Sequence, residues 1–263
     1  MTRARWPRTA GLVLLAALTA AGCTGAPAAQ PPAPATGTAS VYVAIGASES
    51  VGVGSDDPLR GAWTHRLWRE AFPRGAVLVN MGWPGATVEQ ALWDQLPLAL
   101  EQKPDVVTVW LNVNDLVARV PVDEYRRDLR TLVVALRRDG ATQVLVANTP
   151  PLDQLPAYRG CVAGDPEAQA WAHRCPHGAM PPPDVVNAAV AAYNEAIAEV
   201  VRESGATLVD LHAATMAARQ AGTEPGLVGE DGFHPSDAGH ELVARQFAAA
   251  LSGEPKAVVA DRR

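Results

Sequence analysis

The chain of 263 residues has few basic residues. Lysine and arginine number 22 against 28 aspartate and glutamate residues, so the formal net charge is −6. A protein that neutralises phosphates needs a basic surface, and the acidic balance therefore argues against a nucleic-acid partner. The length and the 48% hydrophobic content fit one domain of ordinary size.

A hydrophobic run long enough to span a membrane comfortably is missing from the N-terminal region. The apolar stretch Gly11–Ala21 is too short for that role. It follows a basic start with three arginines and no acids, and small residues come after it. Residues 1–22 therefore predict an export signal, which places the mature protein outside the cytoplasm.

The residues after this signal leave two modes of processing open. Ala20–Ala21–Gly22–Cys23 resembles a bacterial lipobox, in which Cys23 would be lipidated, although that pattern favours leucine where this chain has Ala20. Ordinary secretory cleavage nearby, for instance after Ala28, is the alternative. Residues 23–40 are rich in proline and alanine and predict a tether. The protein is thus expected to be secreted or held at the cell surface, touching a membrane only through such an anchor.

Cysteine is also scarce, with three in the whole chain. Cys161 and Cys175 form an even pair in a chain predicted to be exported, which favours a disulfide. It would close a loop of about 15 residues and contribute about 3 kcal/mol in the chain-entropy model. His173 and His177 lie nearby, but the spacing matches no standard zinc pattern, so we expect no metal site.

From Ser40 onward, strand-like and helix-like segments alternate. Five apolar runs predict strands: Val41–Ile45, Ala76–Val79, Val106–Leu111, Val144–Ala147 and Thr207–Leu211. Between them, apolar residues recur every three or four positions, as in the helix pattern of Tyr125, Leu129, Leu132, Val133 and Leu136. This alternation predicts an α/β fold with a five-stranded parallel sheet between two helical layers.

The domain is assigned to residues 41–252, with residues 253–263 as a C-terminal tail. Its main irregular insertion is the proline-rich interval Pro150–Pro183, and insertions of this kind often shape a binding site. Ser236 is placed to cap a last helix whose inner face carries Leu242, Val243, Phe247 and Leu251.

The first strand is followed by a turn rich in glycine and serine. Gly46, Gly52 and Gly54 allow the chain to bend sharply there, and Ser48 lies inside the bend. In open α/β sheets, ligands bind at the carboxyl end of the strands. Ser48 is therefore a candidate nucleophile, provided that a base and an anion-stabilising pocket exist elsewhere. Without them, a serine in such a turn is ordinary turn chemistry.

Three further motifs follow later elements of the fold. Asn80–Thr87 is a glycine-containing turn whose backbone N–H groups can donate to an anion, and Asn112–Asp115 offers side-chain amides. Each is weak evidence alone. Asp231 precedes His234 by three residues, a spacing that lets the carboxylate reach Nδ1 of the imidazole and leaves Nε2 free to take a proton.

Taken together, these four blocks resemble the SGNH hydrolases, also called the GDSL esterase/lipase family. The resemblance runs from about Val41 to Leu251 and implies a flavodoxin-like SGNH hydrolase fold. The block around the serine of that family is matched by Gly46–Ala47–Ser48. The last block is matched by Asp231 and His234. Four blocks in the right order are far more specific than any one of them.

The resemblance implies a role for each matched residue. Ser48, His234 and Asp231 would form the catalytic triad. The backbone N–H groups of Ser48 and Gly85, with the amide of Asn114, would form the oxyanion hole. The implied reaction is cofactor-free cleavage of a carboxylic ester through an acyl-enzyme, acting on a small-molecule, lipid or glycan ester.

Three residues depart from the family pattern or add to it. Ala47 stands where an aspartate is usual, and Asn112 stands where a glycine is usual. Neither supplies a group that the implied chemistry needs, so we expect activity to be kept while the substrate stays open. Glu49, next to the candidate nucleophile, adds a carboxylate that would repel anionic substrates.

Two other functions remain as alternatives. An acyltransferase or deacetylase acting on cell-surface glycans would share the acyl-enzyme. A non-catalytic solute-binding lipoprotein would explain export and the tether, but not the co-occurrence of the four blocks. The α/β-hydrolase fold is disfavoured because Gly46–Ala47–Ser48–Glu49–Ser50 breaks its Gly-x-Ser-x-Gly motif. Natural substrate, acyl-chain length and oligomeric state are not indicated.

The remaining aromatic and histidine residues mostly have structural interpretations. Trp63, Trp68 and Trp93 fall on helical patterns and are expected in the core, and Asp115 is expected to brace the turn beneath Asn114. Three histidines without a companion cluster are expected at the surface or at helix caps: His65, His212 and His240. Trp83 lies within the glycine turn, where a substrate-pocket role and a packing role are weighed equally.

Overall fold

The computed structural model describes residues 40–162, 175 and 180–253, and this part of the chain is built on a parallel sheet. Its five strands are β1 (Val41–Gly46), β2 (Val77–Asn80), β3 (Val106–Trp110), β4 (Gln143–Ala147) and β5 (Thr207–Val209). They lie in the order β2-β1-β3-β4-β5. This is the flavodoxin-like order, which reverses direction beside β1. The fold class predicted from the sequence is confirmed.

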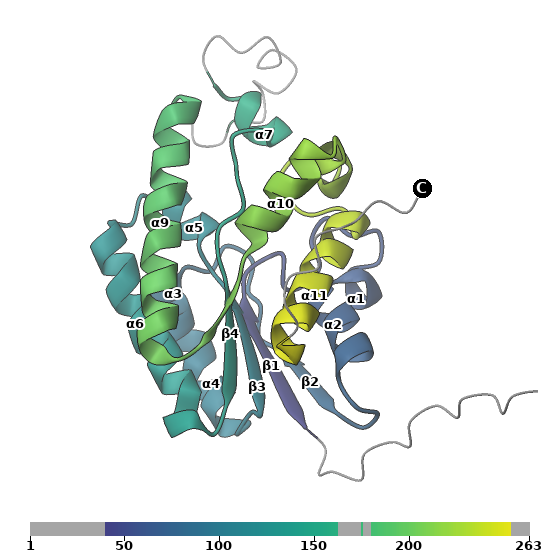
Figure 1. Ribbon diagram of the computed structural model, residues 1–263, viewed down its shortest axis with the longest axis vertical. Helices are drawn as coiled ribbons and strands as arrows, with labels where there is room; N and C mark the ends of the chain where they lie inside the picture. The colour runs from purple at the N-terminus through teal and green to yellow at the C-terminus, as the bar shows by residue number, and fades with distance from the viewer. Residues whose placement is uncertain (1–39, 163–174, 176–179, 254–263) are drawn as a thin grey trace, which may run out of the picture. The chain divides into compact units, whose positions relative to one another are not determined.

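Helices cover both faces of the sheet, which makes three layers (Figure 1). One face carries α3 (Val88–Gln90), α4 (Leu96–Glu101), α6 (Val122–Arg137) and α9 (Pro183–Ser204). The other carries α1 (Pro58–Gly61), α2 (Trp63–Ala71) and α11 (Asp237–Ser252). Short elements connect them: the π-helical turn η1 (Ala91–Gln95), α5 (Val113–Val117), η2 (Arg138–Gly140), α7 (Pro156–Arg159), α10 (Leu211–Gln220) and η4 (Glu224–Leu227).

Alternate residues of each central strand enter different cores. In β1, Val43 and Ile45 pack in the core beneath α6 and α9, whereas Tyr42 and Ala44 pack in the core beneath α2 and α11. All four are fully buried. A strand covered on both faces has no solvent side, which explains why the strands read as continuous apolar runs.

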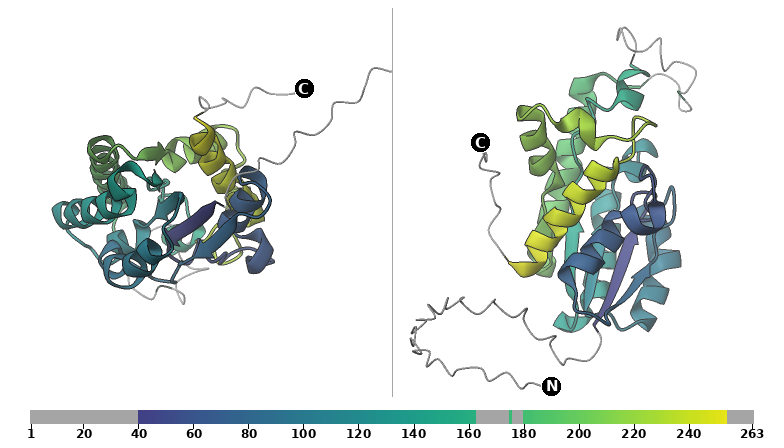
Figure 2. Two further views of the ribbon diagram at one scale, coloured as in Figure 1. Left: turned by 90° about the horizontal axis from the view of Figure 1, so that it is seen from below. Right: turned by 90° about the vertical axis from the view of Figure 1, so that its right-hand side faces the viewer.

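The layer of α2 and α11 contains a buried histidine that the sequence interpretation placed at the surface or at a cap. His240, on α11, is fully buried; its Nδ1 accepts the N–H of Trp63 at 3.3 Å and its Nε2 donates to the carbonyl of Val53 at 3.1 Å. These bonds satisfy both ring nitrogens and tie α11 to the start of α2, which lies beside it (Figure 2). The prediction for His240 was therefore wrong.

Two other expectations need correction. Trp93 was expected in the core but is 76% exposed. Ala91 and Gln95 of η1 are the buried positions, and Trp93 lies between them on the opposite side of the turn. The last strand was expected to reach Leu211 but ends at Val209, because the side chain of Asp210 accepts the N–H of Ala213 and starts α10.

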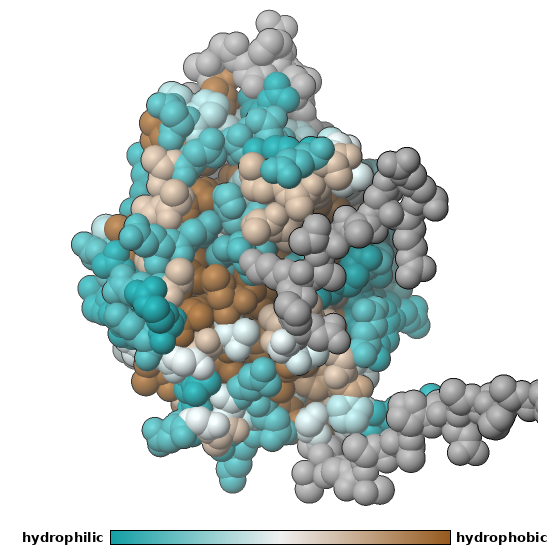
Figure 3. Space-filling view, viewed as in Figure 1, coloured by the Kyte–Doolittle hydropathy of each residue, from teal (hydrophilic) through white to brown (hydrophobic). Residues whose placement is uncertain are grey.

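Several other predictions are met. The disulfide between Cys161 and Cys175 is present. Ser236 caps α11 by accepting the N–H of Gly239, and Trp63 and Trp68 both contribute to a core. Hydrophilic side chains dominate much of the surface seen in Figure 3, and apolar side chains gather between the two helical layers in that view.

Some predictions lie outside the described residues: the export signal in residues 1–22, lipidation at Cys23, nearly all of the tether, the histidines His173 and His177, and nearly all of the tail. Within the part that the structure describes, no helix has the length and apolar character needed to cross a bilayer. In that same part, no group of three or more histidine, cysteine or acidic side chains is arranged to hold a metal ion.

Packing between α2 and α11 generates a stability prediction. Phe247 is fully buried and its ring stacks on Trp63, with centroids 4.5 Å apart. Replacing Phe247 with Ala leaves a cavity and should lower the free energy of unfolding by about 3–5 kcal/mol. Val134→Ala, at a position of α6 that is 55% exposed, should change it by less than about 0.5 kcal/mol. Urea unfolding measures both, and similar costs for the two variants would contradict the packing assignment.

Candidate active site

The candidate nucleophile Ser48 lies in a tight turn directly after β1. The N–H groups of Ser50, Gly52 and Val53 each donate to the carbonyl three or five residues earlier, at 3.1–3.2 Å. Gly46 is required at the end of the strand, because a Cβ there would lie 2.0 Å from Oγ of Ser50. Ser48 is 8% exposed, and it sits at the carboxyl edge of the sheet as predicted.

A buried glutamine holds the end of β1 in place. The Oε1 atom of Gln95 accepts the N–H of Gly46 at 3.1 Å, and its Nε2 donates to the carbonyl of the same residue at 3.0 Å. Both backbone groups are thereby satisfied at the point where the strand ends. Sequence reasoning missed Gln95, because a single glutamine within a helical pattern carries no signal of such a contact.

The segment containing Asp231 and His234 is folded around the aspartate. One oxygen of Asp231 accepts the N–H groups of Phe233 and His234, both at 2.9 Å, and the other meets Nδ1 of His234 at 2.5 Å. Partial burial alone would raise the pKa of Asp231, but these hydrogen bonds outweigh it and hold the pKa below its usual value. The carboxylate is thus kept ionised, and the imidazole has a fixed orientation.

The turn after β1 and the segment before α11 meet at a second glycine. Gly54 has φ of +95°, and a Cβ on it would lie 2.3 Å from the carbonyl oxygen of Pro235 and 2.9 Å from Cβ of His234. Oγ of Ser55 also donates to Asp237 at 2.6 Å. As a result, Nε2 of His234 lies 2.9 Å from Oγ of Ser48, across 186 positions of sequence.

The loop after β2 packs against the turn that holds Ser48. Asn80 donates through Nδ2 to the carbonyl of Ser50 and accepts the N–H of Gly82 through Oδ1. A Cβ on Gly82 would lie 2.9 Å from the carbonyl oxygen of Ala47, so only glycine allows this approach. Asn80 ends β2 and lies two residues before Gly82, a signal from which its bracing role was predictable.

The predicted oxyanion donors come from three segments at this edge: the turn after β1, the loop after β2 and the start of α5. Gly85 has φ of +85°, a conformation that favours glycine. Asn114 donates through Nδ2 to the carbonyl of Ala86 at 3.0 Å, which leaves the second N–H of its amide group for another acceptor. Within the described residues, the backbone N–H groups of Ser48 and Gly85 donate to no protein acceptor. All three predicted donors therefore have an N–H available.

Asp115 braces the same loop from below. It is 1% exposed, and its two carboxylate oxygens lie 3.1 and 3.3 Å from the N–H of Val88, at the start of α3. Burial raises the pKa of Asp115 to about 6, although the hydrogen bond from Val88 opposes that rise. Asn114 and Asp115 together anchor the segment that runs from Gly85 to α3. The sequence predicted that Asp115 would brace only its own turn, whereas it binds a segment 27 residues away.

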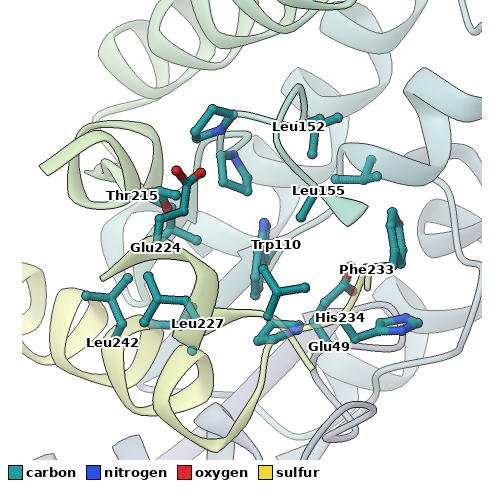
Figure 4. Close-up of a pocket in the computed structure, with 18 residues that line it drawn as sticks. Glu49, Trp110, Leu152, Leu155, Thr215, Glu224, Leu227, Phe233, His234 and Leu242 are labelled. Atoms are coloured by element: carbon teal, nitrogen blue, oxygen red, sulfur yellow. The ribbon is translucent and has the colours of Figure 1, made fainter. Parts of the chain in front are cut away.

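A cavity opens beside His234 (Figure 4). Its walls are mainly apolar and come from the end of β3, the start of α5, the Pro150 loop and the segments near the C-terminus. Pro150, Pro151, Leu152 and Leu155 bring the first part of the long insertion into this wall. Trp83 is not among the lining residues and is 72% exposed. Glu49, which sequence reasoning treated only as a source of repulsion, lines the cavity.

Comparison with known families and structures identifies the type of protein that has this arrangement. Residues 44–242 match the model of the GDSL-like Lipase/Acylhydrolase family. An acetylxylan esterase from Geobacillus stearothermophilus is 25% identical over 199 residues, covering 71% of this chain and 77% of that protein.

Solved structures share the fold at lower sequence identity. A lipase/acylhydrolase from Enterococcus faecalis has a TM-score of 0.59 at 21% identity, covering 82% of this chain and 98% of the other. The acetyl xylan esterase AlAXEase has a TM-score of 0.58 at 16% identity, covering 80% of this chain and 99% of the other. At these identities the similarity concerns the fold.

The buried carboxyl of Asp115 generates a prediction about pH. Its pKa is raised from 3.8 to about 6, so the folded protein holds this proton more tightly than the unfolded chain. Its contribution to the free energy of unfolding should therefore decrease as pH rises through this range, by on the order of 2–3 kcal/mol. Asp115→Asn cannot ionise and should lose this dependence, so its stability relative to wild type should be greater at neutral than at acidic pH.

Urea unfolding of both proteins at about pH 4.5 and about pH 7.5 measures the difference. Asp139→Asn, on the exposed turn η2, is the control for loss of one carboxylate. If the relative stability of Asp115→Asn were the same at both pH values, the raised pKa would be contradicted.

Proposed function

Because the chain belongs to the GDSL-like lipase/acylhydrolase family and is an ester-hydrolysing enzyme, we propose that it cleaves carboxylic esters through Ser48, His234 and Asp231. The observation that carries this proposal is the continuous path from Oγ of Ser48 to Nε2 of His234, and from Nδ1 to the carboxylate of Asp231. A hydroxyl, an imidazole and an oriented carboxylate in this order are what acyl transfer by a serine requires.

The proposed first step forms an acyl-enzyme. Oγ of Ser48 attacks the ester carbonyl carbon while its proton passes to Nε2 of His234, and Asp231 stabilises the imidazolium. The oxyanion accepts hydrogen bonds from the N–H groups of Ser48 and Gly85 and from the amide of Asn114. Each such donor is typically worth about 10²–10³ in rate. Collapse of the intermediate breaks the bond to the alcohol oxygen, which takes the proton from Nε2.

The second step regenerates the enzyme. Water loses a proton to Nε2 of His234 and attacks the acyl carbon, and the proton then returns to Oγ of Ser48 as the carboxylic acid leaves. If an alcohol takes the place of water, the same steps give acyl transfer. The assignment therefore covers an acyltransferase reaction as well as hydrolysis, and the acceptor decides between them.

The proposed substrates are acetyl or other short acyl esters of small alcohols or glycans. The acetylxylan esterase relative supports this class. Action outside the cytoplasm is proposed from the signal-like residues 1–22, and the disulfide between Cys161 and Cys175 is consistent with an oxidising compartment. Lipidation at Cys23 is the proposed means of attachment to a membrane.

Hydrolysis of a p-nitrophenyl ester series, from acetyl to palmitoyl, tests the proposed nucleophile. Ser48→Ala should lower kcat by about 10⁴-fold or more, because the acyl-enzyme cannot form. Ser50→Ala is the matched control: within the described residues its buried Oγ has no hydrogen-bond partner, so its loss should leave most of the activity. The chain-length optimum separates an acetyl esterase from a lipase.

Two results would contradict the assignment. One is activity of Ser48→Ala close to that of wild type, which would remove Ser48 from the mechanism. The other is a folded wild-type protein that turns over no ester of the series and of a set of acetylated sugars. Products of acyl transfer to added alcohol would show that the acceptor need not be water.

A further inference from the structure

The cavity beside His234 is lined by two acidic side chains that the proposed mechanism does not use. Most of the lining is hydrocarbon, contributed by prolines, leucines, valines, Trp110 and Phe233. The polar side chains that line it are Glu49, Thr215, Glu224 and His234. A carboxylate in such surroundings is costly unless it has a partner.

The two glutamates of the cavity differ in their partners. Glu224 binds Arg219 through both oxygens, at 2.6 and 2.8 Å, and Arg219 also binds Asp153 at 2.9 Å. Within the described residues, Glu49 forms no ion pair with a lysine or arginine. Figure 4 shows Glu49 next to His234, with Glu224 further along the cavity. Of the two glutamates, the one closer to His234 is thus the one that has no lysine or arginine partner.

The position of Glu49 follows from the turn that carries Ser48. The two residues are adjacent in the sequence, and their side chains are both held at the carboxyl edge of the sheet. The cavity that Glu49 lines is also lined by His234, which contacts Ser48, so one substituent of an ester bound for attack by Ser48 can extend into it. A plain alkyl substituent would remove water from the carboxyl group and offer no hydrogen bond in return.

We propose that Glu49 is a specificity-determining residue that selects esters bearing a hydroxyl group on the substituent that enters the cavity, and that it disfavours plain alkyl esters. This inference rests on the proposed role of Ser48 as nucleophile. The occupant is a polyol, a sugar or a hydroxylated acyl chain, which share the same hydroxyl chemistry.

A hydroxyl group suits Glu49 better than an ammonium group does. Burial raises the pKa of Glu49, and its own backbone, His234 and Ser48 oppose that rise. A raised pKa makes the protonated form accessible closer to neutral pH. A hydroxyl group both donates and accepts, so it can pair with either form of the carboxyl group, whereas an ammonium group pairs only with the ionised form.

Two matched pairs of substrates test the proposal: hexyl acetate with 6-hydroxyhexyl acetate, and ethyl hexanoate with ethyl 6-hydroxyhexanoate. The quantity compared is the ratio of kcat/KM for the hydroxylated ester to kcat/KM for the plain ester of the same pair. Any effect of Glu49 on the basicity of His234 changes both values alike and cancels in this ratio. Wild type should prefer the hydroxylated member of at least one pair, and the pair identifies whether the alcohol or the acyl group enters the cavity.

Variants at position 49 locate the source of that preference. Glu49→Leu should lower the ratio by about tenfold, the loss expected for one hydrogen bond. Glu49→Gln keeps a donor and an acceptor in the same place and should retain most of the ratio. Glu101→Gln, at the exposed end of α4, removes one negative charge outside the cavity and should leave the ratio unchanged.

A measurement on wild type alone guards against variants that do not fold. Inhibition by 1,6-hexanediol should be stronger than inhibition by 1-hexanol if the cavity binds a hydroxyl group. An enzyme that depends on Ser48 but shows the same ratios with glutamate and leucine at position 49 would overturn the selectivity alone. The absence of any turnover by folded wild type would overturn the proposed function and this inference with it.

Discussion

Close packing of the turn after β1 against the segment before α11 is the constraint on which the rest of the site depends. Gly54 allows it, because a side chain there would collide with the carbonyl oxygen of Pro235 and with Cβ of His234. His240 and Asp237 secure the same contact from α11 by binding Val53 and Ser55. The distance of 2.9 Å between Ser48 and His234 is a consequence of this packing, since neither residue is brought to the other by local sequence.

Several buried polar side chains around the site form hydrogen bonds to the backbone and so fix the positions of its loops. Gln95 satisfies both backbone groups of Gly46, and Asp115 accepts the N–H that starts α3. Buried polar groups lower the stability of a fold unless they form hydrogen bonds. Even with its hydrogen bond, Asp115 has a raised pKa. The free-energy cost of a buried carboxyl group at Asp115 is compatible with a functional requirement, namely a fixed position for the loop that contains Gly85.

The sequence allowed prediction of the parallel sheet, the order of its elements and the residues at its carboxyl edge, because strand burial and loop chemistry are both local patterns. It did not allow prediction of Trp93 as an exposed residue or of His240 as a buried one. Their environments depend on which side of a helix faces a neighbouring layer. Glu49 shows the same limit: its identity is visible beside Ser48, but the apolar walls around it come from β3, the Pro150 loop and the C-terminal helices.

The pKa values of two carboxyl groups near His234 are shifted in opposite directions. Asp231 accepts hydrogen bonds from two backbone N–H groups and from the imidazole, so its charge is stabilised and its pKa is lowered. Glu49 faces an apolar cavity, so burial raises its pKa. Two titratable groups whose environments shift their pKa values in opposite directions are suited to different roles. Asp231 is suited to orient the imidazole at every step, while Glu49 is suited to respond to whatever substituent an ester brings into the cavity.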